Sequence, residues 1–224
     1  MTFSIAGRCG RTGMLGVAIT TSSISVGARC PWVRAGCGAV STQNITDPEL
    51  GPVILDALAA GRGAEEAVAE AVRRPHIEYR QLTVVDGSGE VAHFTGEHIL
   101  GIHAVAQGDG CVAAGNLLAH DGVARVMVET FTAAAGRHLA QRLLDALAAG
   151  VDCGGEQGPV HSAALTVAHE QSWPLVDLRV DWEDDGPVAR LQKLWRAYEP
   201  QMEDYLTRAA NPAAAPSYGV AGDP

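Results

Sequence analysis

Thr2 is the residue in this chain whose chemistry is most distinctive. It follows the initial methionine and begins a β-prone run, Thr2-Phe3-Ser4-Ile5. Methionine before a small residue is normally removed, so we expect the mature chain to begin with a threonine that carries a free α-amine beside its hydroxyl. The pKa of a free α-amine is about 8, which suits a general base near neutral pH. One residue can then supply both nucleophile and base.

Two runs of polar side chains occur where strands are expected to end. Residues 20–23 place four hydroxyls in a row, with Thr21 and Ser22 at their centre, and residues 41–44 include Gln43. Each run is interpreted either as a solvated strand end or as one wall of a polar pocket. Both interpretations stay open at this point.

Three further features also have a structural and a functional interpretation. Arg80 begins a predicted strand and is either a charge at the rim or a bidentate clamp for a carboxylate. Asn116 follows Gly115 and belongs either to a left-handed turn or to a set of oxyanion donors. The glycine-rich residues 154–162, which end in His161 and Ser162, either turn the chain or wrap a ligand.

Metal and cofactor motifs are missing from the sequence. Three of the eight histidines, His93, His98 and His103, are spaced by five, which suits neither one helix face nor one strand face. There is no zinc pattern, no dinucleotide fingerprint and no phosphate loop, and Lys193 is the only lysine. We therefore expect no metal and no cofactor.

The elements that position these residues follow from hydrophobic periodicity and turn signals. The sequence predicts strands at residues 2–8, 14–21, 25–30, 38–42, 80–85, 90–95, 99–106, 111–114, 162–168 and 175–180. It predicts helices at residues 52–60, 64–74, 122–135, 137–149 and 188–198. Residues 31–36 are interpreted as a turn. Strand blocks that alternate with helix pairs indicate an α+β fold with mainly antiparallel sheets.

Composition narrows the class of protein. The chain has 224 residues, 47% of them hydrophobic, and a net charge of −10 with no basic stripe, which argues against nucleic-acid binding. No signal peptide and no membrane-spanning run is expected, and five scattered cysteines indicate reduced thiols, so we expect a cytoplasmic protein without membrane contact. We expect one domain at residues 1–198 and a frayed, Pro/Ala-rich tail at residues 199–224.

Several short motifs occur in an order that resembles one protein family. They are Thr2-Phe3-Ser4-Ile5, Gly16-Val17-Ala18, Gly36-Cys37-Gly38-Ala39-Val40-Ser41-Thr42-Gln43, Arg80-Gln81, Thr95-Gly96, Gly115-Asn116, Gly154-Gly155, Ser162-Ala163-Ala164 and Leu178-Arg179-Val180-Asp181. On these motifs the chain resembles the bacterial and archaeal domain-of-unknown-function family 1028. The resemblance extends from Thr2 to about Tyr198.

The resemblance implies a four-layer αββα sandwich of the N-terminal-nucleophile hydrolase type, the proteasome-like superfamily. It implies Thr2 as nucleophile with its own amine as base, and backbone N–H groups with Asn116 as oxyanion donors. Two positions depart from the family pattern, because Cys9 stands where many members have aspartate and Ser22 where many have lysine. Either one of the arginines at positions 29, 34 and 80 takes the electrostatic role, or the site works in a different way.

We therefore expect an amidohydrolase that cleaves a small amide, ureide or cyclic imide through Thr2. In this hypothesis Arg80 binds a substrate carboxylate, and the remaining expected substrate contacts are Thr21, Ser22, Gln43, His161 and Ser162. One alternative is a non-catalytic protein that binds a small ligand on the same fold. Another keeps the fold but uses Cys9 or a different thiol as nucleophile. A homodimer is also considered, with Trp32, Trp182 and Trp195 as either interface anchors or buried aromatics.

Overall fold

The larger of two β-sheets has the first strand of the chain near its centre. The computed structural model describes residues 1–220, and its six-stranded sheet has the order β10-β9-β2-β1-β8-β7 with every neighbouring pair antiparallel. Its strands are β1 (Thr2–Arg8), β2 (Leu15–Thr21), β7 (Ala104–Gly108), β8 (Cys111–Asn116), β9 (Ser162–Ala168) and β10 (Val176–Val180). Because β1 lies between β2 and β8, both of its edges are hydrogen-bonded.

The smaller sheet has four antiparallel strands in the order β3-β4-β5-β6. They are β3 (Pro31–Arg34), β4 (Gly38–Asn44), β5 (Arg80–Asp86) and β6 (Val91–Thr95). The two sheets lie face to face, and Ala6, Val17 and Val112 of the larger sheet pack against Ala39 and Val85 of the smaller one.

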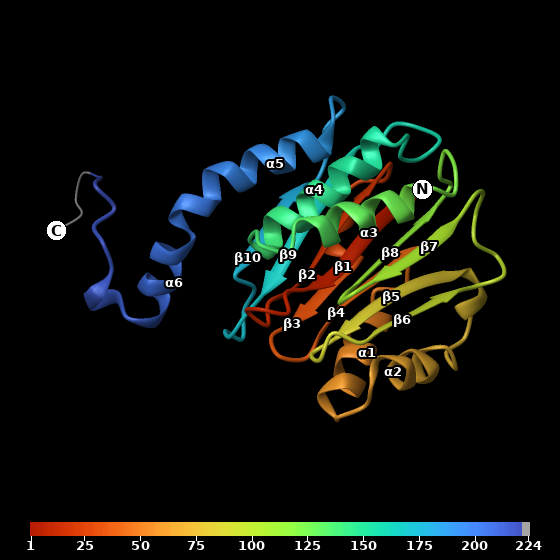
Figure 1. Cartoon of the computed structure of the whole chain (residues 1–224), viewed down its shortest axis with the longest axis horizontal. Helices are drawn as coiled ribbons and strands as arrows, with labels where there is room; N and C mark the ends of the chain where they lie inside the picture. The colour runs from red at the N-terminus through yellow and green to blue at the C-terminus, as the bar shows by residue number, and fades with distance from the viewer. Residues whose placement is uncertain (221–224) are drawn as a thin grey trace.

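Helices cover the outer faces of both sheets (Figure 1). The smaller sheet is covered by α1 (Leu50–Ala59) and α2 (Ala64–Ala71), and the larger by α3 (Val123–Ala133) and α4 (Leu139–Asp152). A further helix, α5 (Pro187–Tyr198), packs beside α4, β9 and β10. The α+β sandwich of two antiparallel sheets with outer helix pairs is confirmed. Each helix predicted from apolar spacing is present, with ends that differ by at most a few residues.

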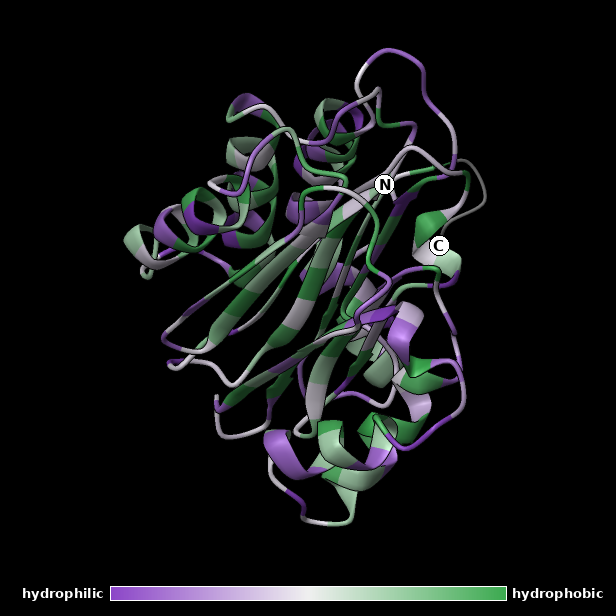
Figure 2. Ribbon diagram, turned by 90° about the vertical axis from the view of Figure 1, so that its right-hand side faces the viewer, coloured by the Kyte–Doolittle hydropathy of each residue, from purple (hydrophilic) through white to green (hydrophobic). Residues whose placement is uncertain are grey.

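Alternation along β1 sends its side chains to two different environments. Phe3 and Ile5 belong to the core beneath α3 and α4, whereas Ala6 belongs to the layer between the sheets. Because strand side chains alternate, Thr2 and Ser4 share the inward face with Ala6. The hydropathy bands along the strands in Figure 2 follow this alternation. The inter-sheet layer is thus apolar around Ala6 and polar toward Thr2.

The predicted strand at residues 25–30 is wrong, and so is the turn at residues 31–36. Residues Val26–Ala28 form a 3-10 turn, η1, because Ser25 has a φ of 55° and the Ser162 hydroxyl accepts a hydrogen bond from the Val26 N–H at 3.1 Å. The strand is β3, which begins at Pro31. A proline at the start of an edge strand removes no required ladder bond, which is why this one is tolerated.

Two further expectations differ from the structure. The strand predicted at residues 99–106 begins only at Ala104, because the Leu100 and Ile102 carbonyls accept hydrogen bonds from the loop after β8, at 2.9 and 2.8 Å. The expected frayed tail contains η3 (Glu199–Gln201), α6 (Met202–Ala210) and η4 (Pro212–Ala214). Figure 1 shows α6 leading away from the sandwich. Residues 221–224 of that predicted tail lie outside the described residues.

The tryptophans have different environments. Trp195 is fully buried in the core of the larger sheet, so it is not an interface anchor, whereas Trp182 is 53% exposed and Trp32 is partly buried. A homodimer stays a prediction. None of the helices within residues 1–220 has the length and apolar character needed to cross a membrane.

Candidate active site

Thr2 begins β1, a central strand of the larger sheet, and is 5% exposed with a polar neighbour on each side. Its register partners are Thr21 on β2 and Asn116 on β8. The hydroxyl oxygens of Thr2 and Thr21 are 3.0 Å apart, within hydrogen-bond distance. Since directly opposed residues in an antiparallel sheet point to the same face, all three side chains are directed between the sheets.

A hydrogen-bonded chain connects the two sheets next to Thr2. Ser4 donates to the Gln43 side-chain oxygen at 2.7 Å, and the Gln43 amide donates to the Gln81 side-chain oxygen at 2.7 Å. Gln81 in turn donates to the Gly115 carbonyl at 3.3 Å, and Asn116 donates a longer bond of 3.4 Å to Gln81. We call the buried inward-facing set here the polar layer, which comprises Thr2, Ser4, Thr21, Ser41, Gln43, Gln81, Thr83 and Asn116.

The hydrogen bonding of the polar layer is incomplete at Asn116. Buried amides are normally fully hydrogen-bonded, because an unsatisfied group costs about 1–3 kcal/mol. The side-chain oxygen of Asn116 has no partner among residues 1–220, and its amide is held only by the long bond to Gln81. Asn116 is therefore a buried amide with an unused acceptor and a weakly engaged donor beside Thr2.

Glu156 is a buried carboxylate close to the start of the chain, and sequence analysis missed it. It lies in a loop where Gly154 and Gly155 have φ values of 117° and 58°, and it forms a β-bridge with Leu118, two residues beyond Asn116. It is 7% exposed, and neither carboxylate oxygen has a well-formed hydrogen bond within the described part of the chain; Ser22 supplies the nearest donors.

The electrostatics of Glu156 depend on the chain's first amine. Burial raises the pKa of its carboxyl to about 7, while the positive charge of that amine and the hydroxyl and N–H of Ser22 act in the opposite direction. A carboxyl with a pKa near 7 exchanges protons at neutral pH. Glu156 is thus a titratable group beside the N-terminus, where a tuned amine would be needed.

Met1 blocks the Thr2 amine while it remains attached. Its carbonyl accepts a hydrogen bond from the Thr21 hydroxyl, and its side chain lies near Gly158. In this form the Thr2 nitrogen is a peptide nitrogen and has no basic lone pair. The site gains its base only when Met1 is removed.

The predicted site residues fall into two groups. Thr2, Thr21, Gln43 and Asn116 come together in the polar layer, and Ser22 lies beside Glu156. Arg80, His161 and Ser162 have other neighbours.

Arg80, His161 and Ser162 make contacts outside the polar layer. The Arg80 guanidinium donates to the Ile45 carbonyl. The Ser162 hydroxyl donates to the Ser23 carbonyl at 2.6 Å, which pins the chain after β2. The His161 ring stacks on Trp182, with centroids 4.4 Å apart. Their roles in substrate binding stay predictions.

Some of the residues that sequence analysis missed could have been recognised from the sequence, and one could not. Ser4 and Gln81 could have been found, because polar residues two apart in buried strands (Thr2 with Ser4, Gln81 with Thr83) indicate a polar inward face. Glu156 had no such signal. A loop carboxylate becomes buried only through contacts that distant segments make.

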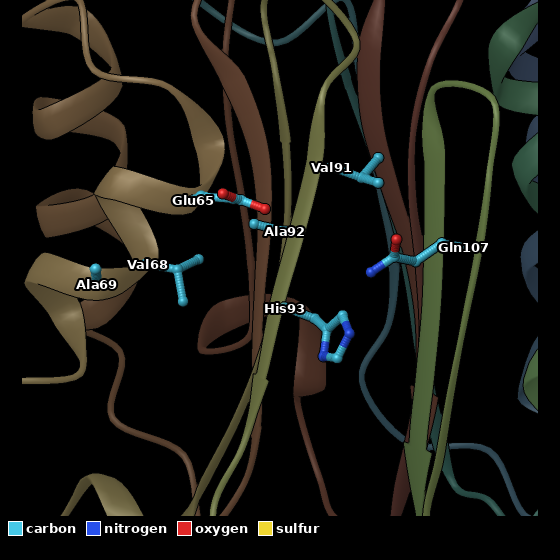
Figure 3. Close-up of a pocket in the computed structure, with 7 residues that line it drawn as sticks. All are labelled: Glu65, Val68, Ala69, Val91, Ala92, His93 and Gln107. Atoms are coloured by element: carbon cyan, nitrogen blue, oxygen red, sulfur yellow. The ribbon is translucent and has the colours of Figure 1, made fainter.

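A separate cavity of about 280 Å³ lies between α2, β6 and β7. Figure 3 shows His93 and Gln107 facing each other across it, with Glu65 above Ala92 on the helix side. Burial lowers the pKa of His93, which favours its neutral form. This cavity contains no Ser, Thr or Cys among its lining residues, and none of the predicted site residues.

Comparison with known proteins gives a family and a close fold match. The DUF1028 family, described as a family of unknown function, matches residues 2–191. The crystal structure of protein SPO2555 from Silicibacter pomeroyi, assigned to the same family, superposes with a TM-score of 0.81 and 31% identity over 88% of each chain. No curated protein matches the sequence.

Two solved structures of Anbu (ancestral β-subunit) proteins are also similar, at a much lower level. The protein from Yersinia bercovieri has a TM-score of 0.39 and 13% identity, covering 93% of this chain and 97% of its own. The Gly-1 mutant from Hyphomicrobium sp. strain MC1 has a TM-score of 0.41 and 12% identity, covering 98% and 100%. Values this low carry no functional information about the present chain.

Proposed function

The chain belongs to the DUF1028 family, and from the geometry of its site we propose that it is an amidohydrolase with Thr2 as N-terminal nucleophile. The observation that carries this proposal is the position of Thr2, which is buried at the start of the central strand β1, between Thr21 and Asn116. A threonine placed there only for strand stability would have no need of the polar layer around it.

The reaction begins when the free Thr2 amine takes the proton of the Thr2 hydroxyl. The oxygen attacks the carbonyl carbon of a small amide, ureide or cyclic imide, and the carbonyl oxygen becomes negatively charged. The Asn116 amide and backbone N–H groups donate to that oxygen. The ammonium then protonates the leaving nitrogen, an ester forms on Thr2, and water activated by the same amine hydrolyses it.

Glu156 and Thr21 support the amine in this proposal. The Glu156 carboxylate lies close enough to the N-terminus for charge interaction, so it can hold and orient an ammonium. The Thr21 hydroxyl, released from the Met1 carbonyl on trimming, stays within 3.0 Å of the Thr2 hydroxyl. The charged side chain beside the amine is then a carboxylate, opposite in sign to the arginines expected from sequence.

Two of those arginines are engaged elsewhere. Arg29 donates to the Ile24 carbonyl at 2.7 Å, and Arg34 pairs with Asp56 at 2.8 Å. Within residues 1–220, neither side chain forms a hydrogen bond with the polar layer. In this proposal the charged group that acts on the Thr2 amine is a carboxylate. We therefore expect turnover to be fastest at the higher end of neutral pH, where the Thr2 amine is unprotonated.

The substrate is proposed to be uncharged where it meets the polar layer. That layer offers hydroxyls and amides but contains neither lysine nor arginine. Neutral amide and imide groups match these donors and acceptors, whereas a buried carboxylate would lack a cation there. The Arg80 clamp remains a proposal for a carboxylate at the rim.

Comparison of three variants tests this function. Thr2→Ala removes the hydroxyl but preserves methionine trimming and a free amine, and Thr2→Ser keeps both groups. Thr207→Ala changes a threonine of α6 whose hydroxyl bonds only to the Glu203 carbonyl, and serves as control.

Each protein is first checked by intact mass for loss of Met1 and then screened against amides, ureides and cyclic imides. We expect turnover in the wild type, Thr2→Ser and Thr207→Ala, and none in Thr2→Ala. Normal turnover by Thr2→Ala contradicts the proposal.

A non-catalytic ligand-binding protein is the second candidate. The side-chain oxygen of Asn116, which has no partner within residues 1–220, fits this function because a buried acceptor can take a hydrogen bond from a ligand. A chain that retains Met1 would have no base at Thr2. A protein that keeps Met1 and binds one of the screened compounds unchanged, with equal affinity in Thr2→Ala, supports this second function.

A further inference from the structure

A second polar cavity lies at the opposite end of β1 from Thr2. It has a volume of about 330 Å³, and three arginines, Arg8, Arg11 and Arg142, are among the residues that line it. Because β1 rises about 3.3 Å per residue, the cavity lies about 20 Å from the polar layer. It shares no residue with that layer and is therefore a separate site.

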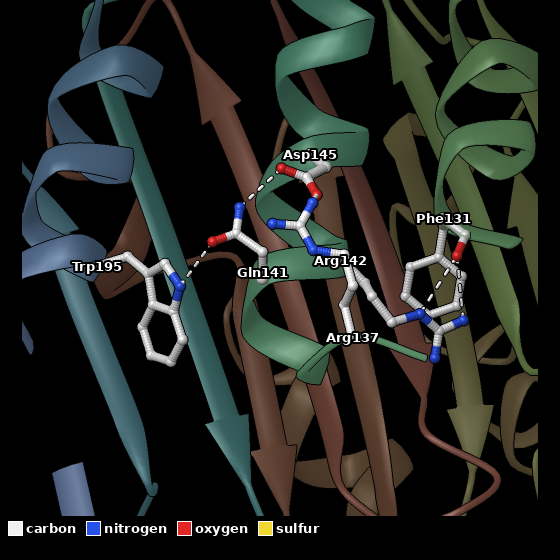
Figure 4. A network of polar contacts seen from close by, with 6 residues as sticks. All are labelled: Phe131, Arg137, Gln141, Arg142, Asp145 and Trp195. Atoms are coloured by element: carbon white, nitrogen blue, oxygen red, sulfur yellow. Dashed lines mark hydrogen bonds and ion pairs between the residues drawn. The ribbon is translucent and has the colours of Figure 1, made fainter. Parts of the chain in front are cut away.

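The guanidinium group of Arg142 is buried in the wall of this cavity. Arg142 is 5% exposed, and its Nε and one terminal nitrogen donate to the Phe131 carbonyl at 3.2 and 3.1 Å. Its guanidinium carbon lies 3.8 Å from the centre of the Phe131 ring, as Figure 4 shows. Asp145 on the same helix pairs with Arg137 instead. The partners of Arg142 within residues 1–220 are therefore a carbonyl and a ring, and the second terminal nitrogen has no hydrogen bond there.

Neutral groups also hold the other two arginines at the cavity. Arg11 donates to the Gly136 carbonyl at 3.1 Å. The Arg8 side chain runs beside two turns, because a Cβ added at Gly89 would lie 3.6 Å from its Cδ and one added at Gly110 would lie 3.9 Å from its Cβ. The Nε of Arg8 is buried and has no hydrogen-bond partner in the described part of the chain. Since a guanidinium carries five N–H donors, most donors of these arginines are unused.

Carboxylates do not neutralise this cluster. The arginines that form ion pairs within residues 1–220 are Arg34, Arg62, Arg74, Arg125, Arg137 and Arg179. Glu90 and Asp109 also line the cavity, but both are exposed and neither pairs with an arginine in the described chain. The whole chain carries 26 acidic residues and 16 basic ones, so composition alone does not account for unpaired arginines gathered at one cavity.

The physical chemistry of arginine indicates what such a cavity can hold. A guanidinium keeps its charge in a protein, and a buried charge is unfavourable unless an opposite charge and hydrogen bonds compensate it. The carbonyl and the ring of Phe131 compensate the charge of Arg142 only in part. Carboxylate and phosphate oxygens match the planar fork of a guanidinium and form strong, charge-assisted hydrogen bonds with it.

We propose that this cavity binds a small dianion whose charge lies on phosphate or carboxylate oxygens. A volume of about 330 Å³ suits a small molecule. Arg142 supplies the buried charge, and Arg8 and Arg11 supply further N–H donors. The negative charge of the ligand is concentrated beside these arginines, because Glu90 and Asp109 repel an anion elsewhere in the cavity.

The test uses the full chain with two probes, inorganic phosphate and malonate, each compared with sodium chloride at the same ionic strength. Thermal unfolding and titration calorimetry measure binding. A ligand that binds only the folded state raises the melting temperature, so we expect at least one probe to raise it above the chloride value. The probe that does so distinguishes a phosphate ligand from a dicarboxylate. Melting temperatures equal to that in chloride for both probes overturn the proposal.

Four variants assign the binding to this cavity. Arg142→Gln should raise the Kd at least about tenfold, because hydrogen bonds to a charged group contribute that much. Arg11→Gln, at an exposed position, should raise it about threefold, as expected for an exposed charge. Asp109→Asn removes a repelling charge and should lower the Kd. Arg125→Gln is the control, because it makes the same charge change at an arginine that pairs with Glu129 and does not line the cavity.

Wild-type affinity in both Arg142→Gln and Arg11→Gln overturns the proposal, and so does an equal loss of affinity in Arg125→Gln. If Arg142→Gln does not fold, the opposite effects expected of Arg11→Gln and Asp109→Asn decide, and an unchanged Kd in both overturns the proposal. Thr2→Ala is expected to bind the probe as the wild type does, so the outcome is independent of the amidohydrolase proposal.

Discussion

Replacing Glu156 with glutamine should stabilise the protein at alkaline pH and leave it nearly unchanged at acidic pH. The pKa of this buried carboxyl is about 7 instead of its ordinary 4.5, chiefly because burial disfavours the charged form. One pKa unit corresponds to about 1.4 kcal/mol, so ionised Glu156 costs the folded state about 3 kcal/mol. Glutamine has the same shape and no charge, and therefore avoids this cost.

The pH window follows from the direction of the shift. A carboxyl whose pKa is raised on folding binds its proton more tightly in the folded state, so its contribution is most favourable below pH 4.5. That contribution is lost as the pH rises from 4.5 through about 7. The difference in unfolding free energy between Glu156→Gln and wild type should therefore grow over this interval and level off above it.

Urea unfolding at a series of pH values measures that difference. Glu97→Gln is the matched control, since Glu97 is exposed, and its curve should follow the wild type at every pH. All proteins are compared in the same state of Met1 removal, because the chain's first amine interacts with Glu156. A Glu156→Gln effect that does not change with pH would refute the buried, proton-binding role assigned to this residue.

Three other substitutions test separate parts of the account. Asn116→Ala should lower kcat about 10²- to 10³-fold by removing an oxyanion donor, measured on a compound that the wild type hydrolyses. Gln81→Leu should lower the unfolding free energy in urea by about 2 kcal/mol or more, because the amide of Gln43 loses its acceptor at 2.7 Å. Gly51→Ala should lower the melting temperature, since a new Cβ would lie 2.2 Å from the Trp32 ring.

Each of these predictions has its own contrary result. Unchanged kcat in Asn116→Ala would remove it from the oxyanion site, and an unaltered urea midpoint in Gln81→Leu would mean that water replaces the lost acceptor. Gly63→Ala is the control for Gly51→Ala, because nothing lies within 4 Å of its added Cβ. Equal melting temperatures for these two glycine variants would contradict the close approach of Trp32 to α1.

The sequence predicted the layers of this fold because periodicity reports which face of an element is buried. Apolar spacing located the helices, and the glycines that follow α1 marked its end correctly. The prediction was wrong at Pro31, where turn-prone residues begin strand β3. An edge strand tolerates a proline that a central strand would not. The prediction of a strand at Leu100 was also wrong, because the Leu100 carbonyl accepts a hydrogen bond from the loop after β8.

The site was predictable only where its residues lie on regular strands. Thr2, Thr21 and Asn116 occupy neighbouring strands of the larger sheet at matching register, and Gln43 lies on the facing sheet. The polar layer follows from the alternation of side chains along these strands. Glu156 depends on a loop whose path is set by distant contacts. The sequence contains no signal that a carboxyl in such a loop is buried. Its raised pKa therefore follows only from the folded arrangement.

The most direct test of the central claim is where an acyl group attaches. The protein, first shown by intact mass to lack Met1, is treated with a β-lactone and mapped by peptide mass spectrometry. The account predicts one acyl group on the Thr2 hydroxyl and none on the Thr2→Ala protein. An adduct of the same stoichiometry in Thr2→Ala, or a chain that retains Met1 and leaves Thr2 unmodified, would contradict it.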